Sequence, residues 1–299
     1  MRIKGVEIED TFAEAFDMVA GRLLITAKNK KWALQAANIT TGFATSVIAC
    51  GAEAGIENLV GAKETPDGRP GVNILVLAMS EKALQDQLMR RVGQCIMTCP
   101  TTACFNNLEE GEKEINIGGK LRFFGDGYQI SKRIGGRRFW RIPVMEGEFL
   151  VEEKFKIRKA VGGGNFLILG RDADCVLEAA EKAVEAIKGV RNVVTPFPGG
   201  VVRSGSQVGS KYKFLRASTN IPYCPTLRSV VESKIPKGVN SVLEIVINGL
   251  DEESVKKATK VGIEEACSVD GIKLITAGNY GGKLGKHLIY LHKLFEGSR

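Results

Sequence analysis

The two halves of this 299-residue chain repeat one order of expected elements, and this repeat limits the folds open to it. Each half alternates short apolar runs, which are typical of strands, with segments whose apolar residues recur at helical spacing. In the first half we expect a strand, a helix, two strands, a helix begun by Ser80, and a short strand or turn. These elements are expected at residues 22–27, 32–39, 45–50, 72–78, 80–92 and 95–98.

The second half repeats that order with clearer helix signals. Asp172 and Asp251 each stand directly before apolar residues at helical spacing, so each is expected to cap the start of a helix. Gly189 is expected to end the first of these helices. The strands of this half are expected at residues 165–169, 190–195, 242–247 and 272–276.

Strand–helix–strand, repeated twice in each half, is typical of the split βαβ or ferredoxin-like pattern with right-handed crossovers. We therefore predict an α+β fold of two ferredoxin-like lobes, residues 1–147 and residues 148–299. Residues 115–149 have no helical period and place glycine pairs between apolar and aromatic runs. This segment is predicted to be a β-hairpin insertion between the lobes.

The net charge of +8 is compatible with nucleic acid or with small anionic ligands. The basic residues are dispersed, and the aromatic residues do not alternate with them as a stacking platform for bases would require. Nucleic-acid binding is therefore disfavoured. No apolar run approaches the length of a membrane span, and the N-terminal residues lack the apolar segment of a secretory signal. We expect a cytoplasmic protein.

Seven cysteines and two histidines give no pattern of metal ligands. Cys95, Cys99 and Cys104 are spaced C-x3-C-x4-C, and neither histidine is near a cysteine pair. A zinc or iron–sulfur site is poorly supported, and buried reduced thiols are favoured. Cys99 is considered as a nucleophile, but no histidine nearby in the sequence could activate it.

Residues 195–214 concentrate residue types with special backbone properties: two prolines, four glycines, three serines and three basic residues. Prolines fix φ, and glycines permit conformations that other residues avoid. A backbone that closely approaches a polar or anionic ligand would need such a composition. A glycine-rich turn followed by an edge strand is the alternative.

Motifs along nearly the whole chain, in order, are similar to those of the formylmethanofuran:tetrahydromethanopterin formyltransferase family. The matching segments in the first half are residues 8–16, 41–43, 52–57, 65–71, 93–95, 99–103 and 123–128. Those in the second half are residues 163–166, 195–214, 223–226, 244–247 and 275–286.

The resemblance implies an enzyme that moves a formyl group from the amine of methanofuran to N5 of tetrahydromethanopterin. It implies no prosthetic group and no metal, with the two carriers as substrates, and a homo-oligomer that is typically a tetramer built from dimers. Such acyl transfer passes through a tetrahedral intermediate. It needs oriented carriers, donors for the oxyanion and a proton moved between two nitrogens.

Glu244 is the first candidate for the proton transfer, and the resemblance gives a glutamate of this strand that role. Strand alternation places Glu244 on one face with Val242 and Val246, so burial among apolar neighbours should raise its pKa. A carboxylate facing solvent or paired with a lysine is the alternative.

The remaining site candidates follow from the matching motifs. Tyr212 and the serines of residues 195–210 are candidate donors to the oxyanion, and the glycines there could let the pterin lie against the backbone. The candidates for substrate binding are Glu53, Thr98, Thr101, Gly199, Gly200, Ser204, Ser206, Asn279, Tyr280 and Lys283.

Three positions depart from the family pattern as we expect it: Gly51 in place of a proline, Ala78 in place of a histidine, and Arg203 in place of a small residue. They leave open a modified pterin or an inactive pterin-binding paralogue. A further alternative is the formyltransferase subunit of a bacterial formyltransferase/hydrolase complex.

Overall fold

The structure is a computed structural model that describes residues 1–205 and 207–296. Contacts divide the chain into two compact units, Met1–Asp17 with Val161–Arg299 (unit 1) and Met18–Ala160 (unit 2). The sequence places a lobe boundary at residues 147–148 instead. The two divisions differ because strands β3 (Phe12–Thr26) and β11 (Lys154–Gly170) each run from one unit into the other.

Four strands of unit 2 pair antiparallel in the order β6–β3–β5–β4. Helices α1 (Lys30–Thr41) and α3 (Glu81–Arg91) bury small and apolar residues against the strands. Ser80 caps α3 as predicted, with its Oγ accepting a hydrogen bond from the Ala83 N–H at 3.2 Å. The remaining strands of this sheet are β4 (Glu53–Val60), β5 (Gly71–Ala78) and β6 (Ala103–Asn106).

One expectation for the first half is wrong, and a second is met by its turn alternative. Residues 45–50 are not a strand, because the Ser46 side chain caps the short helix α2 (Val47–Cys50) and Gly51 ends it at φ +74°. The strand lies in β4 instead, where polar residues obscure the apolar alternation. Residues 95–98, expected to be a short strand or turn, form a turn, because α3 continues into a π-turn over Val92–Ile96 and the sheet resumes only at β6.

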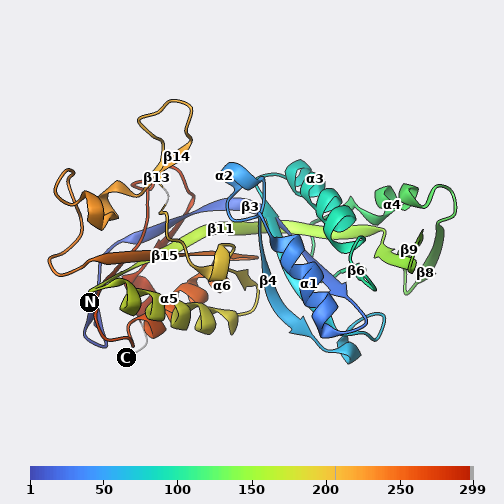
Figure 1. The fold of residues 1–299 in the computed structure, drawn as a ribbon, viewed down its shortest axis with the longest axis horizontal. Helices are drawn as coiled ribbons and strands as arrows, with labels where there is room; N and C mark the ends of the chain where they lie inside the picture. Colours follow the sequence, from blue (N-terminus) through green and yellow to red (C-terminus); the bar gives the residue numbers. More distant parts are fainter. Residues whose placement is uncertain (206, 297–299) are drawn as a thin grey trace. The chain divides into compact units, whose positions relative to one another are not determined.

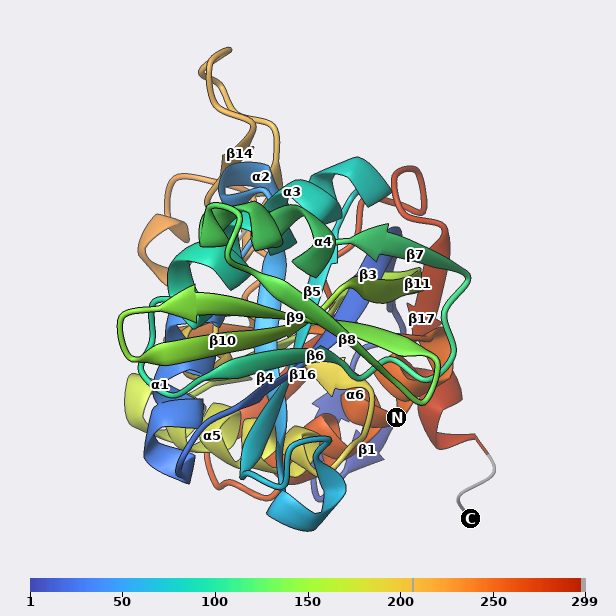
Figure 2. The ribbon, with the colours of Figure 1, turned by 90° about the vertical axis from the view of Figure 1, so that its right-hand side faces the viewer.

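The hairpin insertion is present over residues 130–152 (Figure 2). Strands β8 (Ile130–Ile134), β9 (Arg137–Val144) and β10 (Gly147–Glu152) form two antiparallel pairs, and β10 also pairs with β6. Residues 118–125 are helical rather than extended, as α4 (Gly118–Leu121) followed by a 3-10 turn over Arg122–Gly125. A short strand, β7 (Lys113–Asn116), precedes them and pairs with the start of β11.

Unit 1 has an antiparallel sheet in the order β16–β11–β15–β12. Helices α5 (Ala173–Lys188) and α6 (Glu252–Ala266) lie side by side on one face of it (Figure 1). Asp172 and Asp251 cap these helices as predicted. The other strands are β12 (Val193–Val194), β15 (Ser241–Gly249) and β16 (Ile272–Thr276). β12 is shorter than predicted because residues 189–192 form a turn.

Short elements complete unit 1. β2 pairs with β16, and β17 pairs with the first residues of β3. The strands are β1 (Arg2–Ile3), β2 (Val6–Ile8), β13 (Gln207–Val208), β14 (Ala217–Ser218) and β17 (His287–Tyr290). The 3-10 turns are η4 (Pro198–Gly200), η5 (Ile221–Tyr223), η6 (Pro225–Leu227) and η7 (His292–Phe295); η1 (Ala62–Glu64) belongs to unit 2. Among the described residues, no helix is long and apolar enough to cross a membrane.

Candidate functional site

Glu244 lies on the face of the unit 1 sheet that α5 and α6 leave uncovered. On the helix-covered face, Phe166 and Ile245 are part of the core. Leu167 is directly opposite Glu244 on β15 and Thr276 on β16, and residues in one cross-strand row share a face. The alternation predicted for this strand is therefore confirmed.

The Glu244 side chain is buried, with 8% of the residue exposed. Within the described part of the chain its Oε2 has no hydrogen-bond partner, and burial is the sole cause of the shift of its pKa. Burial in apolar surroundings raises its pKa to about 7. The alternative of a solvent-facing or lysine-paired carboxylate is thereby excluded. A carboxyl with a pKa near 7 can both donate and accept a proton near neutral pH.

A pocket of about 80 Å³ opens on Glu244, and the glycine-rich segment forms part of its wall. Val202 exchanges two backbone hydrogen bonds with Glu244, its N–H donating at 2.7 Å and its carbonyl accepting at 3.0 Å. This bridge brings Ser204 and Gly205 to the pocket lining. Arg203, one of the departures from the family pattern, also lines this pocket. The structure therefore joins the two strongest sequence features, Glu244 and the segment 195–214, in one place.

Sequence reasoning missed two residues of the pocket region as site residues, Tyr223 and Thr276. Tyr223 lines the pocket, and its hydroxyl lies 3.5 Å from the Thr276 hydroxyl in the Glu244 row. Burial raises the pKa of Tyr223, so its hydroxyl keeps its proton. The segment 223–226 matches the family motifs, which is the signal that could have found Tyr223.

Gly199 and Gly200 lie in the turn η4, before the pocket wall. Both have positive φ, and a Cβ at Gly200 would meet the Val184 side chain of α5 at 2.8 Å. Gly200 therefore packs the turn against a helix, whereas a Cβ at Gly199 would meet nothing within 4 Å. Ser206 lies outside the described residues.

Tyr280 is the predicted site residue whose hydroxyl is influenced by Glu244. Burial raises the pKa of Tyr280, and the nearby charges of Glu244 and Glu14 raise it further. Asn279 beside it is used structurally, because its Nδ2 donates to the Phe12 carbonyl at 3.1 Å and to the Thr11 hydroxyl at 3.2 Å. Lys283 is exposed.

Tyr212 is not brought to Glu244 in the contacts of the described residues. It lies between β13 and β14, 64% exposed, with its ring 5.7 Å from that of Phe214. Its backbone N–H donates to the Ser210 hydroxyl at 3.1 Å.

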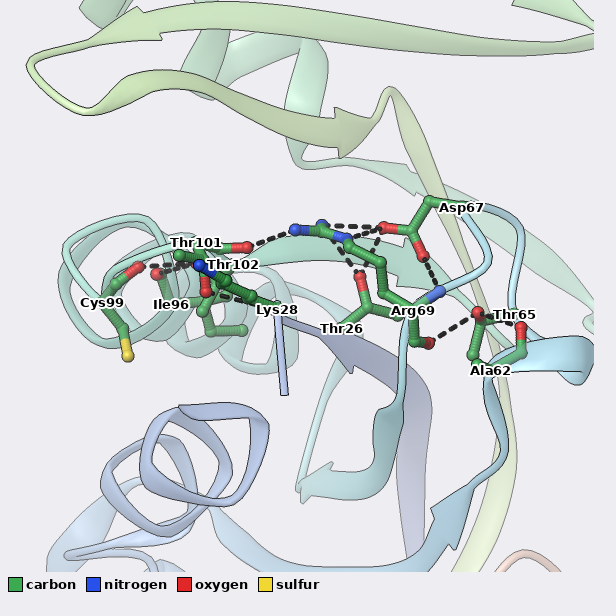
Figure 3. Close-up of polar contacts among 10 residues, drawn as sticks. All are labelled: Thr26, Lys28, Ala62, Thr65, Asp67, Arg69, Ile96, Cys99, Thr101 and Thr102. Atoms are coloured by element: carbon green, nitrogen blue, oxygen red, sulfur yellow. Dashed lines mark hydrogen bonds and ion pairs between the residues drawn. The ribbon is translucent and has the colours of Figure 1, made fainter. Parts of the chain in front are cut away.

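Three predicted residues belong to unit 2, where Thr101 is held on several sides (Figure 3). Its hydroxyl accepts from the Lys28 N–H at 3.1 Å, its carbonyl accepts from Arg69, and its N–H donates to Glu146 at 2.8 Å. A cavity of about 400 Å³ lies here, lined in part by Lys28, Arg69, Cys99 and Thr101.

The other two unit 2 candidates have internal partners. The Thr98 hydroxyl donates to the Gln94 carbonyl at 2.7 Å, and buried Glu53 accepts from the Val47 N–H at 3.1 Å. Burial raises the pKa of Cys99, which opposes formation of a nucleophilic thiolate. Within residues 1–205 and 207–296, no group of three or more potential ligands could hold a metal ion.

The model of the formylmethanofuran–tetrahydromethanopterin formyltransferase family matches residues 1–144. A second model, for the proximal lobe of that formyltransferase, matches residues 147–294. This chain belongs to the formylmethanofuran–tetrahydromethanopterin formyltransferase family.

Members of this family from bacteria and archaea align with the chain over almost its full length. The formylmethanofuran–tetrahydromethanopterin formyltransferase of Methylococcus capsulatus is 57% identical, with 98% of this chain and 99% of that protein covered. The enzyme of the same name from Methanothermus fervidus is 56% identical, with 99% of this chain and 100% of that protein covered.

Two solved structures share the fold at high identity. The Methanosarcina barkeri formyltransferase has a TM-score of 0.94 at 54% identity, covering 99% of this chain and 100% of that one. A chain of the formyltransferase/hydrolase complex from Methylorubrum extorquens, solved with methylofuran, has a TM-score of 0.96 at 49% identity, covering 99% of each. The α+β fold is thereby confirmed.

Proposed function

We propose that this chain transfers the formyl group of formylmethanofuran to N5 of tetrahydromethanopterin, reversibly and without a covalent enzyme intermediate. The observation that carries the proposal is the buried carboxyl of Glu244 at a pocket, whose Oε2 has no partner among the described residues, in a chain more than half identical to formyltransferases of that name. The pocket is smaller than the roughly 300–1,000 Å³ that whole drug-sized ligands occupy, so it suits the formyl end of a carrier.

Direct transfer begins when N5 attacks the formyl carbon and a tetrahedral intermediate forms. Neutral Glu244 donates its proton to the methanofuran nitrogen as the bond between that nitrogen and the formyl carbon breaks. The resulting carboxylate accepts the proton that N5 releases, so Glu244 ends the cycle neutral. A carboxyl with a pKa near 7 can perform both steps at little cost.

The oxyanion of the intermediate needs donors. The sequence favours Tyr212 for this role, but Tyr280 is the tyrosine influenced by the Glu244 charge, so we propose Tyr280 as the hydroxyl donor. Ser204 and Gly205 of the pocket wall are proposed to contact the substrate. The other predicted residues are still proposed to contact the carriers. In unit 1 these are Gly199, Gly200, Ser206, Asn279 and Lys283, and in unit 2 they are Glu53, Thr98 and Thr101. Tyr212, in the exposed hairpin between β13 and β14, is still predicted to contact a carrier.

We propose that each unit is a ferredoxin-like lobe. The boundary between the two lobes in the sequence is proposed to lie near residue 147. The sheet orders β6–β3–β5–β4 and β16–β11–β15–β12 support this. If the strands of each unit are numbered along the chain, both orders read fourth, first, third, second. The chain is further proposed to be cytoplasmic, to use the two carriers with no prosthetic group, and to form a homotetramer.

Formyl transfer by the purified chain, with Glu244→Gln and Glu178→Gln beside it, tests the function. Glu178 is a matched control because it is an exposed glutamate of α5 paired with Lys182. We expect turnover in the wild type and in the control, and a loss of about 100-fold or more in Glu244→Gln. Absence of turnover in the wild type, in a folded homo-oligomer, would contradict the proposal.

A role as a subunit of a formyltransferase/hydrolase complex is the second candidate. The likeness to a chain of such a complex, at a TM-score of 0.96, favours it. If it is correct, the chain purified alone is inactive and gains formyl transfer on adding the partner subunits.

A further inference from the structure

A single buried carboxylate organises the loop that carries Tyr280. Glu14 of β3 is 1% exposed and points away from its neighbours Ala13 and Ala15, which lie in the helix-covered core. Its Oε2 accepts hydrogen bonds from the N–H groups of Tyr280 at 2.7 Å and Gly282 at 2.9 Å. Its Oε1 accepts from those of Leu284 and Gly285, both at 2.5 Å. Four main-chain donors therefore converge on one side chain.

The loop sequence is suited to wrapping around this carboxylate. Gly281 and Gly282 have φ of +69° and +73°, conformations that other residues adopt only with strain. A Cβ at Gly285 would lie 2.4 Å from the Ala15 carbonyl, so only glycine permits that approach to β3. Successive N–H groups in such a turn form an anion-binding concavity. Here the anion comes from the chain itself.

The same loop is fastened to the face that holds Glu244. Asn165 is on β11, two residues before Leu167 and therefore on the Glu244 face. Its Oδ1 accepts from the Gly278 N–H at 2.6 Å, and its Nδ2 donates to the Gly278 carbonyl at 3.1 Å. Tyr280 thus lies two residues after Gly278, which is fixed to this face, and its ring lies 6.3 Å from that of Phe16.

We propose that Glu14 is a positioning residue, which holds residues 280–285 so that the Tyr280 hydroxyl stands beside Glu244 during formyl transfer. This deepens the proposed function and rests on it. The backbone hydrogen bonds from the loop lower the pKa of Glu14 against the opposing effect of its burial, so the carboxylate is the resident form. An amide in its place has only one accepting oxygen, which leaves two of the four donors without a partner.

The test compares Glu14→Gln with Asp17→Asn, its matched control. Asp17 lies on the same strand, and among the described residues its side chain bonds to Lys286 and His287, directly after the loop. We expect Glu14→Gln to lower kcat by about 10- to 100-fold, the cost of a small misplacement at a reacting centre. Asp17→Asn should stay within about twofold, because exposed ion pairs contribute little.

A double-mutant cycle separates positioning from a general structural role. In the Tyr280→Phe background, Glu14→Gln should change kcat by less than about threefold, because the group it positions is gone. A purely structural carboxylate would instead lower kcat by the same factor in both backgrounds, and that result overturns the proposal.

Gly282→Ala provides a second route if Glu14→Gln does not fold. This change strains the loop at φ +73° with its nearest neighbour at 3.8 Å, and Gly238→Ala is its control because Gly238 has φ +82° in open space elsewhere in unit 1. A fall in kcat for Gly282→Ala alone, absent in the Tyr280→Phe background, supports the proposal. If the wild type is active and Gly282→Ala has the same kcat, the positioning proposal is overturned. An inactive wild type defeats the proposed function and this inference together.

Discussion

At the scale of single residues, Glu244 owes its chemistry to two neighbours in the sheet. Leu167 lies opposite it on β11, Val202 pairs with its backbone on the other side, and only 8% of the residue is exposed to water. No described side chain compensates its charge at Oε2. The neutral form is therefore favoured until the pH reaches about 7.

This environment predicts that folding stability depends on pH through Glu244. Its pKa is raised from 4.5 to about 7 in the folded protein, so the stability it contributes is present below pH 4.5 and is lost as the pH rises towards 7. A shift of this size corresponds to about 3 kcal/mol. Glu244→Gln should accordingly stabilise the protein more at pH 8 than at pH 5, measured by urea unfolding at both values. An equal effect at both values would contradict a buried neutral acid.

At the scale of elements, the helices of unit 1 begin at aspartates that the sequence identifies. Asp251 Oδ1 accepts from the Ser254 N–H at 2.7 Å at the start of α6. Asp251→Ala should lower the free energy of unfolding by about 1 kcal/mol, a normal N-cap loss, measured by urea denaturation. Asp174→Ala, an exposed change in the first turn of α5, is the control and should cost less than half of that.

The elements also explain what the sequence could and could not predict. Helices with an aspartate or serine cap and apolar strands such as β5 were predictable, because each carries its own local signal. The strand β4 was not, because Glu53, Glu57 and Asn58 interrupt its apolar pattern and its pairing with β5 supplies the order. Glu244 stood out as a charge in an apolar run. The role of Glu14 could not be predicted, because the four N–H groups that bind it come from residues more than 260 positions away in the sequence.

At the scale of the whole molecule, the proposed site residues come from both units, which have the same strand order. Glu244, the glycine-rich wall and the Tyr280 loop belong to unit 1, whereas Glu53, Thr98 and Thr101 belong to unit 2. The family relatives cover the chain from end to end, so both units are part of the same enzyme in those proteins.

The assembly of the whole chain is predicted to be a homotetramer that is active without other subunits. Sedimentation equilibrium combined with a formyl-transfer assay on the same fractions measures both properties. Activity that travels with the tetramer agrees with the prediction. An inactive homo-oligomer that acquires activity only with partner subunits would favour the complex seen for the Methylorubrum extorquens relative.

The pH dependence of kcat for formyl transfer tests the central claim most directly, because it reports the protonation state that catalysis requires. With Glu244 acting as a neutral acid, kcat of the wild type should fall as the pH rises through about 7, and the low remaining kcat of Glu244→Gln should show no such fall. A wild-type kcat that is constant from pH 6 to pH 8, or a Glu244→Gln variant with the same profile as the wild type, would contradict the account.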